Sequence, residues 1–397
     1  MPVDATPGPA THGPAAANDL SGRSLSPLLF VGFAAASIGG PLALLSLLPD
    51  AAGDAVDSAG LVVVVGLALF AAPLGIWLVY SGRIATAGGL TAFVDEAAGR
   101  RIALAQGWIW AFAYFLYLPY TVTFVVYDVL APVFPGIKPY RGALELILPI
   151  AIVLVALSPV RLVLIGIGAL AVAQLALLLV VGALEYGHAS TTVSASGVGG
   201  TGRAAAATAL LFVCASLPLY LGAEVRGGSP TIRRGLLVAV GVVGAAFLFA
   251  AIPLGSVPDS LRDAPVPGVA IAEAYGSRGL GVAVGILTAA SSLVLIVAEY
   301  LALARLLHWL HGPPVRELIK WIAIPFVLAD VVSLIDPDRF YDDLIKPSLA
   351  ALYVSQLVVF VVFPRFRRGA LPLAAATVAS GLFVWGMYAL FSSGAAS

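Results

Sequence analysis

The chain has 397 residues, of which 60% are hydrophobic and only 11% are charged, and its mean hydropathy is +1.02. Soluble domains carry about 25% charged residues, so this composition excludes a soluble globular protein and predicts a membrane protein. The formal net charge is zero, which leaves no concentrated basic face for nucleic acid. The single cysteine and the four scattered histidines offer no disulfide framework and no metal or catalytic cluster, so no cofactor and no metal are expected.

Continuous apolar stretches predict an all-α membrane protein with about eleven transmembrane helices. These stretches cover residues 26–48, 59–81, 104–132, 142–158, 161–185, 204–223, 234–255, 279–308, 319–335, 344–363 and 370–392. Residues 1–24 are rich in Pro, Ala and Gly and have no basic segment ahead of a short apolar core, so they are interpreted as a disordered cytoplasmic tail and not as a signal peptide.

The distribution of basic residues predicts the orientation. With the N-terminus inside, 14 of the 21 Lys and Arg residues fall on the cytoplasmic side. An odd number of helices then places the C-terminus outside. Eighteen Arg against three Lys suggest a bacterial source, and hence the cytoplasmic (inner) membrane.

A shift of about 177 residues lays spans one, two, three and five on spans six, seven, eight and ten, as in transporters built from internal repeats. Because five spans separate the halves, the two repeats have inverted topology. The expected organisation is a first repeat at 25–185, an external loop at 186–203, a second repeat at 204–363, and an extra C-terminal helix with its tail at 364–397.

Both repeats contain an interruption in their first span. Ser37-Ile38-Gly39-Gly40-Pro41 weakens span one, because proline lacks an amide donor and glycine permits non-helical dihedrals. Cys214-Ala215-Ser216-Leu217-Pro218 occupies the matching place in span six. Glycine and proline are also common in ordinary membrane helices, but their occurrence at matching repeat positions favours a binding site between helices one and six.

Two further segments resemble a known family, the amino acid-polyamine-organocation permeases. Residues 88–110, with Gly88-Gly89-Leu90-Thr91 and Gly107-Trp108, are similar to the family signature between its second and third helices. The loop with Glu224, Arg226 and Pro230 is similar to the segment after the sixth helix of the family. The resemblance implies the leucine-transporter-type fold, with five plus five inverted helices, and an amino acid, amine or related organic cation as substrate.

In this reading the substrate meets the two broken helices. Free main-chain N–H groups and the helix dipole favour a carboxylate at such a break. The candidate substrate-binding residues lie at the two breaks and in the middle of spans three and ten; they are Ser37, Ile38, Gly39, Gly40, Cys214, Ala215, Ser216, Leu217, Tyr117, Tyr353 and Ser355. For the last three, helix packing with an inter-helix hydrogen bond is an equally simple explanation.

Span eight carries the candidates for ion coupling. The resemblance to sodium-coupled members of this fold implies that Ser291 and Ser292 complete an oxygen cage for Na⁺, although two small residues also ease close helix packing. Glu299 is an intramembrane carboxyl, which is costly unless it is paired or protonated. It is expected to bind a substrate ammonium or to carry the coupling proton, unless it pairs locally with water or Arg305. We favour H⁺ over Na⁺ on this ground, and Asp330 in span nine presents the same alternatives.

Glu224 beside Arg226 is expected to belong to a cytoplasmic gate. No nucleotide-binding motif is present, so energy is expected to come from an ion gradient or from solute exchange. The expected partners are therefore the lipid bilayer, a small-molecule substrate and H⁺ or Na⁺. A membrane sensor on the same fold, which binds solute without moving it, is the alternative, and an intramembrane enzyme lacks a convincing cluster.

Overall fold

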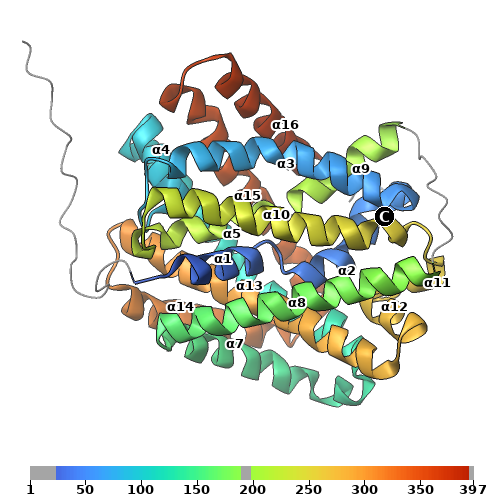
Figure 1. The fold of residues 1–397 in the computed structure, drawn as a ribbon. Coiled ribbons are helices and arrows are strands. Elements are labelled where there is room, and N and C mark those ends of the chain that lie inside the picture. Colours follow the sequence, from blue (N-terminus) through green and yellow to red (C-terminus); the bar gives the residue numbers. More distant parts are fainter. Residues whose placement is uncertain (1–23, 189–197, 393–397) are drawn as a thin grey trace, which may run out of the picture.

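The computed structural model describes residues 24–188 and 198–392, and all their regular elements are helices (Figure 1). The longer elements are α1 (Pro27–Ala36), α2 (Pro41–Ala52), α3 (Ala59–Ser81), α4 (Gly89–Ala98), α5 (Arg100–Phe124), α7 (Arg141–Leu157), α8 (Val160–His188), α9 (Val198–Leu210), α10 (Ser229–Leu254), α12 (Pro267–Tyr275), α13 (Arg278–Trp309), α14 (Val315–Ser333), α15 (Pro337–Phe366) and α16 (Ala370–Ser392). Short elements are η1 (Gly53–Ser58), η2 (Val125–Leu130), α6 (Ala131–Val133), η3 (Pro135–Tyr140), η4 (Val213–Glu224) and α11 (Asp259–Arg262). The predicted tail lies, apart from its last residue, outside the described residues.

Nine helical runs in the described part of the chain are long and apolar enough to cross a membrane. One of them, Pro27–Ser81, contains two predicted crossings, because it holds α1 with α2 and then α3. The predicted ninth span, α14, is not among the nine; Arg316, Glu317, Lys320 and Asp330 lower its apolarity. With these two differences, the helices agree with the prediction of about eleven spans.

The order of the helices repeats. The series α1–α2, α3, α5, α7 and α8 has its counterpart in α9–η4, α10, α13, α14 and α15. The chain starts beside the end of η4, where Leu25 N donates to Glu224 O at 3.0 Å. The far end of α2 lies instead beside the end of α16, since Ala51, Ala389 and Leu390 line one cavity. α1 therefore begins at one end of the molecule, and α16, the last described helix, ends at the opposite end.

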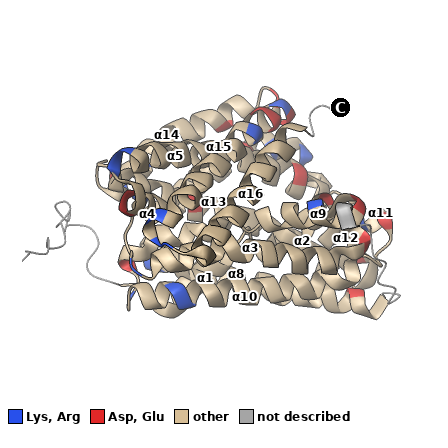
Figure 2. Cartoon of the chain, turned by 90° about the horizontal axis from the view of Figure 1, so that it is seen from above, with Lys and Arg blue, Asp and Glu red and all other residues tan. Residues whose placement is uncertain are grey.

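Basic and acidic residues are concentrated at these two opposite ends of the molecule. Figure 2 shows Lys and Arg gathered mainly at the end of the molecule where α1 begins and α4 lies, whereas Asp and Glu gather around α11 and α12 at the other end. Most side chains between these ends are uncharged. This distribution fits a membrane crossed along the long axis of the helices.

The first predicted break is present. α1 ends at Ala36 and α2 begins at Pro41, and between them Gly39 and Gly40 have φ of 82° and 73°. These dihedrals are accessible to glycine but strained for other residues. Pro41 is the first residue of α2, where its missing N–H costs nothing.

The second break lies slightly earlier than predicted. α9 ends at Leu210, and Cys214 to Pro218 belong to the 3₁₀ segment η4 instead of forming an extended interruption. The interruption itself is at Leu211 and Phe212, which hold neither glycine nor proline. The predicted loop at 186–203 is also shorter than expected, because α8 continues to His188 and α9 begins at Val198; residues 189–197 lie outside the description.

Candidate functional site

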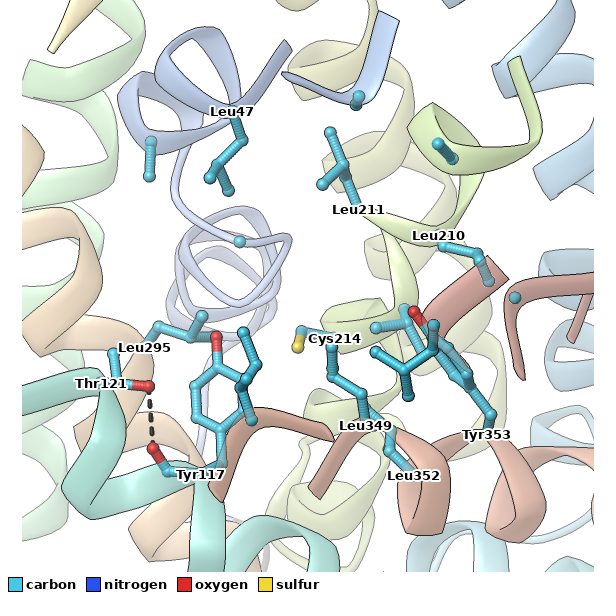
Figure 3. Close-up of a pocket in the computed structure, with 18 of the residues that line it drawn as sticks. Leu47, Tyr117, Thr121, Leu210, Leu211, Cys214, Leu295, Leu349, Leu352 and Tyr353 are labelled. Atoms are coloured by element: carbon cyan, nitrogen blue, oxygen red, sulfur yellow. Dashed lines mark hydrogen bonds between the residues drawn. The ribbon is translucent and has the colours of Figure 1, made fainter. Parts of the chain in front are cut away.

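The two breaks meet inside the protein. A Cβ atom placed on Gly39 would lie 3.3 Å from the carbonyl oxygen of Leu211, so the first break touches the second. A cavity of about 360 Å³ opens beside this contact (Figure 3). A volume of this order holds a small organic molecule.

The described residues of the cavity wall carry no charged side chain. Its described lining consists of Gly39, Ala43, Leu44, Leu47, Ala51, Tyr117, Tyr120, Thr121, Phe124, Ala207, Leu210, Leu211, Val213, Cys214, Ser292, Leu295, Tyr341, Ile345, Leu349, Leu352, Tyr353, Trp385, Gly386, Ala389 and Leu390. No Asp, Glu, Lys or Arg is among them. Hydroxyl groups, one thiol and the indole N–H of Trp385 are thus the polar side-chain groups offered to a ligand, beside several aromatic faces.

Five predicted substrate or ion residues line this cavity: Gly39, Tyr117, Cys214, Ser292 and Tyr353. In Figure 3, Cys214 lies between Tyr117 on one side and Tyr353 on the other. These residues come from α5, η4, α13, α15 and the first break, so the helix arrangement brings together positions that are far apart in the sequence.

Other predicted site residues pack beside the cavity without lining it. Ser37 donates to the carbonyl of Phe33 at 2.8 Å, and Ile38, Ala215 and Leu217 are fully buried. Three further predicted substrate residues, Gly40, Ser216 and Ser355, and the ion candidates Ser291 and Glu299 also lie outside the cavity lining.

Ser216 and Ser355 serve helix packing. Ser216 Oγ accepts a hydrogen bond from Gln356 Nε2 at 3.1 Å, and Ser355 Oγ accepts one from Gln106 Nε2, also at 3.1 Å. Gln106 in turn accepts from Thr91 at 2.7 Å. These bonds join α15 to η4, α5 and α4; neither serine lines the cavity, and a contact of Ser216 or Ser355 with substrate stays a prediction.

Ser291 abuts the first break. A Cβ on Gly40 would overlap Ser291 Oγ and lie 2.9 Å from Ser291 Cβ. The Ser291 hydroxyl donates to Gln174 Oε1 of α8 at 2.7 Å, and both residues are fully buried. Gln174 Nε2 has no hydrogen-bond partner. The hydroxyl predicted to hold a cation therefore donates to the buried amide of Gln174.

Glu299 lies one helical turn beyond Leu295, behind the cavity wall. Its side chain is fully buried, and Oε1 accepts a weak hydrogen bond from Cys214 Sγ at 3.8 Å, whereas Oε2 has no partner. Tyr114 OH is 3.9 Å from the same sulfur. The thiol of Cys214 thus stands between the cavity and the carboxyl, and the alternative of a Glu299–Arg305 pair is wrong.

Arg305 pairs with Glu224 instead. Arg305 Nε lies 2.6 Å from Glu224 Oε1, and both side chains are almost completely buried. Arg305 Nη1 also donates to the carbonyl of Leu301 at 3.0 Å. Arg226 is exposed, and its main-chain N–H donates to Leu25 O at 2.9 Å. Glu224 therefore pairs with Arg305, which the sequence spacing could not connect with it, and the gate predicted from Glu224 and Arg226 stays a prediction.

Aromatic side chains close the space between the cavity and this ion pair. The ring of Trp110 lies 4.0 Å from that of Tyr114 and 4.4 Å from that of Tyr220. Tyr220 packs against Gly89, where an added Cβ would come within 2.6 Å of its ring. Along η4 the described cavity lining thus ends at Cys214, and these rings pack beyond it toward Glu224.

A second polar cluster lies away from the cavity, between α5, α7 and α14. Glu145 Oε1 accepts from Thr123 Oγ1 at 2.5 Å and from Ser333 Oγ at 2.7 Å. Asp330, one turn before Ser333, is fully buried and neither of its oxygens has a partner. Glu145 was not singled out from the sequence, although the rule that identified Glu299 applies equally to it. Within residues 24–188 and 198–392, no group of three or more His, Cys, Asp and Glu residues is arranged to hold a metal.

Comparison by sequence finds no relative: no protein-family model and no curated protein matches the chain. Solved structures do match. A mutant of the manganese transporter of Eremococcus coleocola aligns with a TM-score of 0.66 at 12% identity, over 94% of this chain and 88% of that one. A Na⁺-coupled sialic acid symporter in a substrate-bound outward-open state gives 0.63 at 10% identity, over 93% and 90%.

The third comparison is with Mhp1, a nucleobase-cation-symport-1 family transporter in a closed conformation. It gives a TM-score of 0.57 at 14% identity, and the alignment covers 94% of both chains. The chain has the leucine-transporter-type fold. These structural neighbours are transporters and not enzymes. At such low identity the likeness concerns the fold alone, and the functions of the neighbours do not extend to this chain without further argument.

Proposed function

We propose that the chain is a secondary active transporter that moves a small organic solute across the cytoplasmic membrane by alternating access. The observation that carries this proposal is the cavity where the two helix breaks touch, in a leucine-transporter-type fold. Broken helices at the interface of inverted repeats are where transporters of this architecture bind their solutes.

The proposed solute is an amino acid, an amine or a related small organic molecule, as in the amino acid-polyamine-organocation permeases that the sequence resembles. The cavity supports this class in two ways. Its lining has no basic residue, so a carboxylate would rely on main-chain N–H groups at the start of α2, since those of Ser37, Ile38, Leu211 and Phe212 donate to the preceding turns. Its aromatic walls, including Tyr117 and Tyr353, suit an apolar body or an ammonium group.

The Glu224–Arg305 pair and the Trp110–Tyr220 contact support a closed cytoplasmic side. With the predicted N-terminus inside, the cavity residues Ala51, Ala389 and Leu390 lie toward the exterior, which supports assigning an outward-facing state. Alternating access would then part η4 from α13 at this pair. The basic residues gathered near the start of α1 support this orientation (Figure 2).

For coupling we favour H⁺ over Na⁺. Glu299 is a buried carboxyl with one oxygen unpartnered, and ionising it there is costly, so a proton that comes and goes with access is a plausible coupled species. The serine pair supports Na⁺ less well, because Ser291 already donates to Gln174 beside the break. Exchange without net ion movement is the further mode of transport that these contacts allow.

Counterflow in proteoliposomes tests the transporter against the sensor. The purified chain would first be screened against amino acids and amines by thermal shift, since a ligand of the native state stabilises it. A stabilising solute is then loaded inside, and uptake of the labelled solute is followed. Saturable counterflow supports transport, whereas binding without counterflow supports the sensor.

Cys214 supplies a probe of the site. A small methanethiosulfonate reagent entering the cavity should modify Cys214 and block uptake, and bound solute should slow the modification. Cys214→Ala is the control that removes the effect of the reagent. Inhibition that solute does not slow would place the solute elsewhere.

Coupling has its own test. Glu299→Gln should retain solute counterflow but lose accumulation driven by a pH gradient. The double variant Ser291→Ala with Ser292→Ala should retain such accumulation. Uptake that requires Na⁺, ignores a pH gradient and disappears in the serine variant would assign the coupling to Na⁺.

A further inference from the structure

The C-terminal helix α16 forms part of the cavity. This helix follows the two repeats in the sequence and belongs to neither of them. Nevertheless, four of its residues line the cavity: Trp385, Gly386, Ala389 and Leu390. Residues at these spacings lie on one face of a helix. One face of the last turns of α16 therefore closes the cavity that the two repeats leave open.

The packing of α16 fixes the position of this face. A Cβ on Gly386 would lie 2.6 Å from Leu210 Cδ1 and 3.1 Å from Tyr353 Cε2, so α16 approaches α9 and α15 closely. One turn earlier, the Phe383 ring meets Tyr353 edge to face, with 5.6 Å between centroids. Leu210 and Tyr353 also line the cavity, and Figure 3 shows both on the same side of Cys214. Gly386 thus sets how far α16 stands from the cavity centre.

The chemistry at this side is mainly apolar. Leu210, Leu349 and Leu352 join the α16 face, and Trp385 contributes a half-buried indole. The lining shows no charged side chain here; its polar groups are the hydroxyl of Tyr353 and the indole N–H of Trp385, whereas the thiol of Cys214 and the hydroxyl of Tyr117 lie away from Leu210 in Figure 3. A substituent that reaches this side is stabilised by burial of apolar area and by contact with aromatic rings.

We propose that the face of α16 formed by Trp385, Gly386, Ala389 and Leu390 is an apolar subsite that binds an uncharged aromatic or branched aliphatic substituent of the solute. The polar end of that solute lies at the helix breaks. Trp385 determines specificity by its contact with the substituent, and Gly386 sets the depth of the subsite. The part of this inference that concerns selection among transported solutes rests on the proposed function. The part that concerns binding of an apolar group at α16 does not.

The first experiment uses indole as an uncharged probe of the subsite alone, with the full chain in lipid nanodiscs. Saturable thermal stabilisation by indole is expected for the wild type. Trp385→Ala should weaken the apparent affinity at least about tenfold, and Gly386→Ala should do so by filling the subsite. The matched controls lie on the same helix: Tyr388 is 70% exposed, and Gly381 has no atom within 4 Å of an added Cβ. Tyr388→Ala and Gly381→Ala should therefore bind indole as the wild type does.

The second experiment asks for selection among solutes. Glycine, L-leucine and L-phenylalanine, and the amines methylamine, isopentylamine and phenethylamine, would be compared in counterflow. The wild type should prefer the larger member of each series, and Trp385→Ala should reduce that preference by about tenfold. Gly381→Ala should keep it.

The outcomes separate the two proposals. Indole binding that needs Trp385, together with no counterflow of any solute, would leave the subsite standing and overturn the transporter. Counterflow with an unchanged preference in Trp385→Ala would overturn the subsite and leave the transporter standing. Absence of saturable indole binding in the wild type, or equal binding in all four variants, would also overturn the subsite. If Gly386→Ala fails to fold, indole binding by Trp385→Ala compared with Tyr388→Ala decides whether the subsite exists.

Discussion

Gly40 offers the sharpest test of the first helix break. It is the N-cap of α2, with φ 73° and ψ 119°, and an added Cβ would overlap Ser291 Oγ. Alanine at such dihedrals costs about 1–3 kcal/mol, and overpacking against Ser291 adds about 1–3 kcal/mol. Gly40→Ala should therefore lower the free energy of unfolding by about 2–6 kcal/mol.

Two comparisons separate these contributions. Gly99 is the N-cap of α5, with φ 86° and ψ 163°, and no atom lies within 4 Å of its added Cβ. Gly99→Ala should thus show the dihedral strain alone, about 1–3 kcal/mol. In a Ser291→Gly background the obstacle to a Cβ on Gly40 is gone, and Gly40→Ala should again cost only the strain.

The assay is a double-mutant cycle of Gly40→Ala with Ser291→Gly, measured by denaturant unfolding of the purified chain in micelles. The expected coupling is about 1–3 kcal/mol, in the direction that makes the alanine less harmful when Ser291 is absent. Equal costs of Gly40→Ala in both backgrounds would show that the break does not abut Ser291.

In parallel, Gly39→Val and Gly40→Val should abolish solute binding while membrane insertion is retained, because valine stiffens the break and a side chain on Gly39 enters the cavity. Wild-type binding by both would remove the break from the site.

Asp330→Asn should be neutral or mildly stabilising, because it removes a buried carboxyl without a hydrogen-bond partner, whereas Glu145→Gln should cost about 1–3 kcal/mol by disturbing two accepted hydrogen bonds. Unfolding of both variants measures the contrast, and an equal loss in the two would contradict it. For orientation, single cysteines at Asp54 and Arg367 in a Cys214→Ala background should be labelled by an impermeant reagent in intact cells at position 54 only. Preferential labelling at 367 would invert the topology.

The helix pattern and the first break follow from local chemistry, and this is why the sequence predicts them. Apolar runs of membrane length have few alternative structures, and Gly39-Gly40-Pro41 combines permissive dihedrals with a missing donor. The second break was misplaced by a few residues because Leu211 and Phe212 carry no such chemistry. It forms where α9 meets Gly39, which is a tertiary contact.

The cavity wall was predicted only in part for a different reason. In a helix that is apolar on all sides, hydropathy does not distinguish residues that face lipid from those that face a cavity, so the contribution of Trp385 was invisible. An amide such as Gln174 inside an apolar span needs a partner, but that this partner is Ser291 shows only in the fold. Glu145 did carry a signal, since a carboxyl inside a membrane helix is unusual wherever it occurs.

The buried pair of Glu224 and Arg305 has a consequence for how readily the protein changes state. Two leucines in contact at these positions would be stabilised by burial of their apolar area. Separating them would lose that stabilisation without any gain in hydration free energy. Two opposite charges lose their mutual attraction on parting but regain hydration, so the closed and open arrangements differ by less than the strength of the contact suggests. In the proposed transport cycle, hydration of both charges therefore offsets part of the free energy needed to separate η4 from α13.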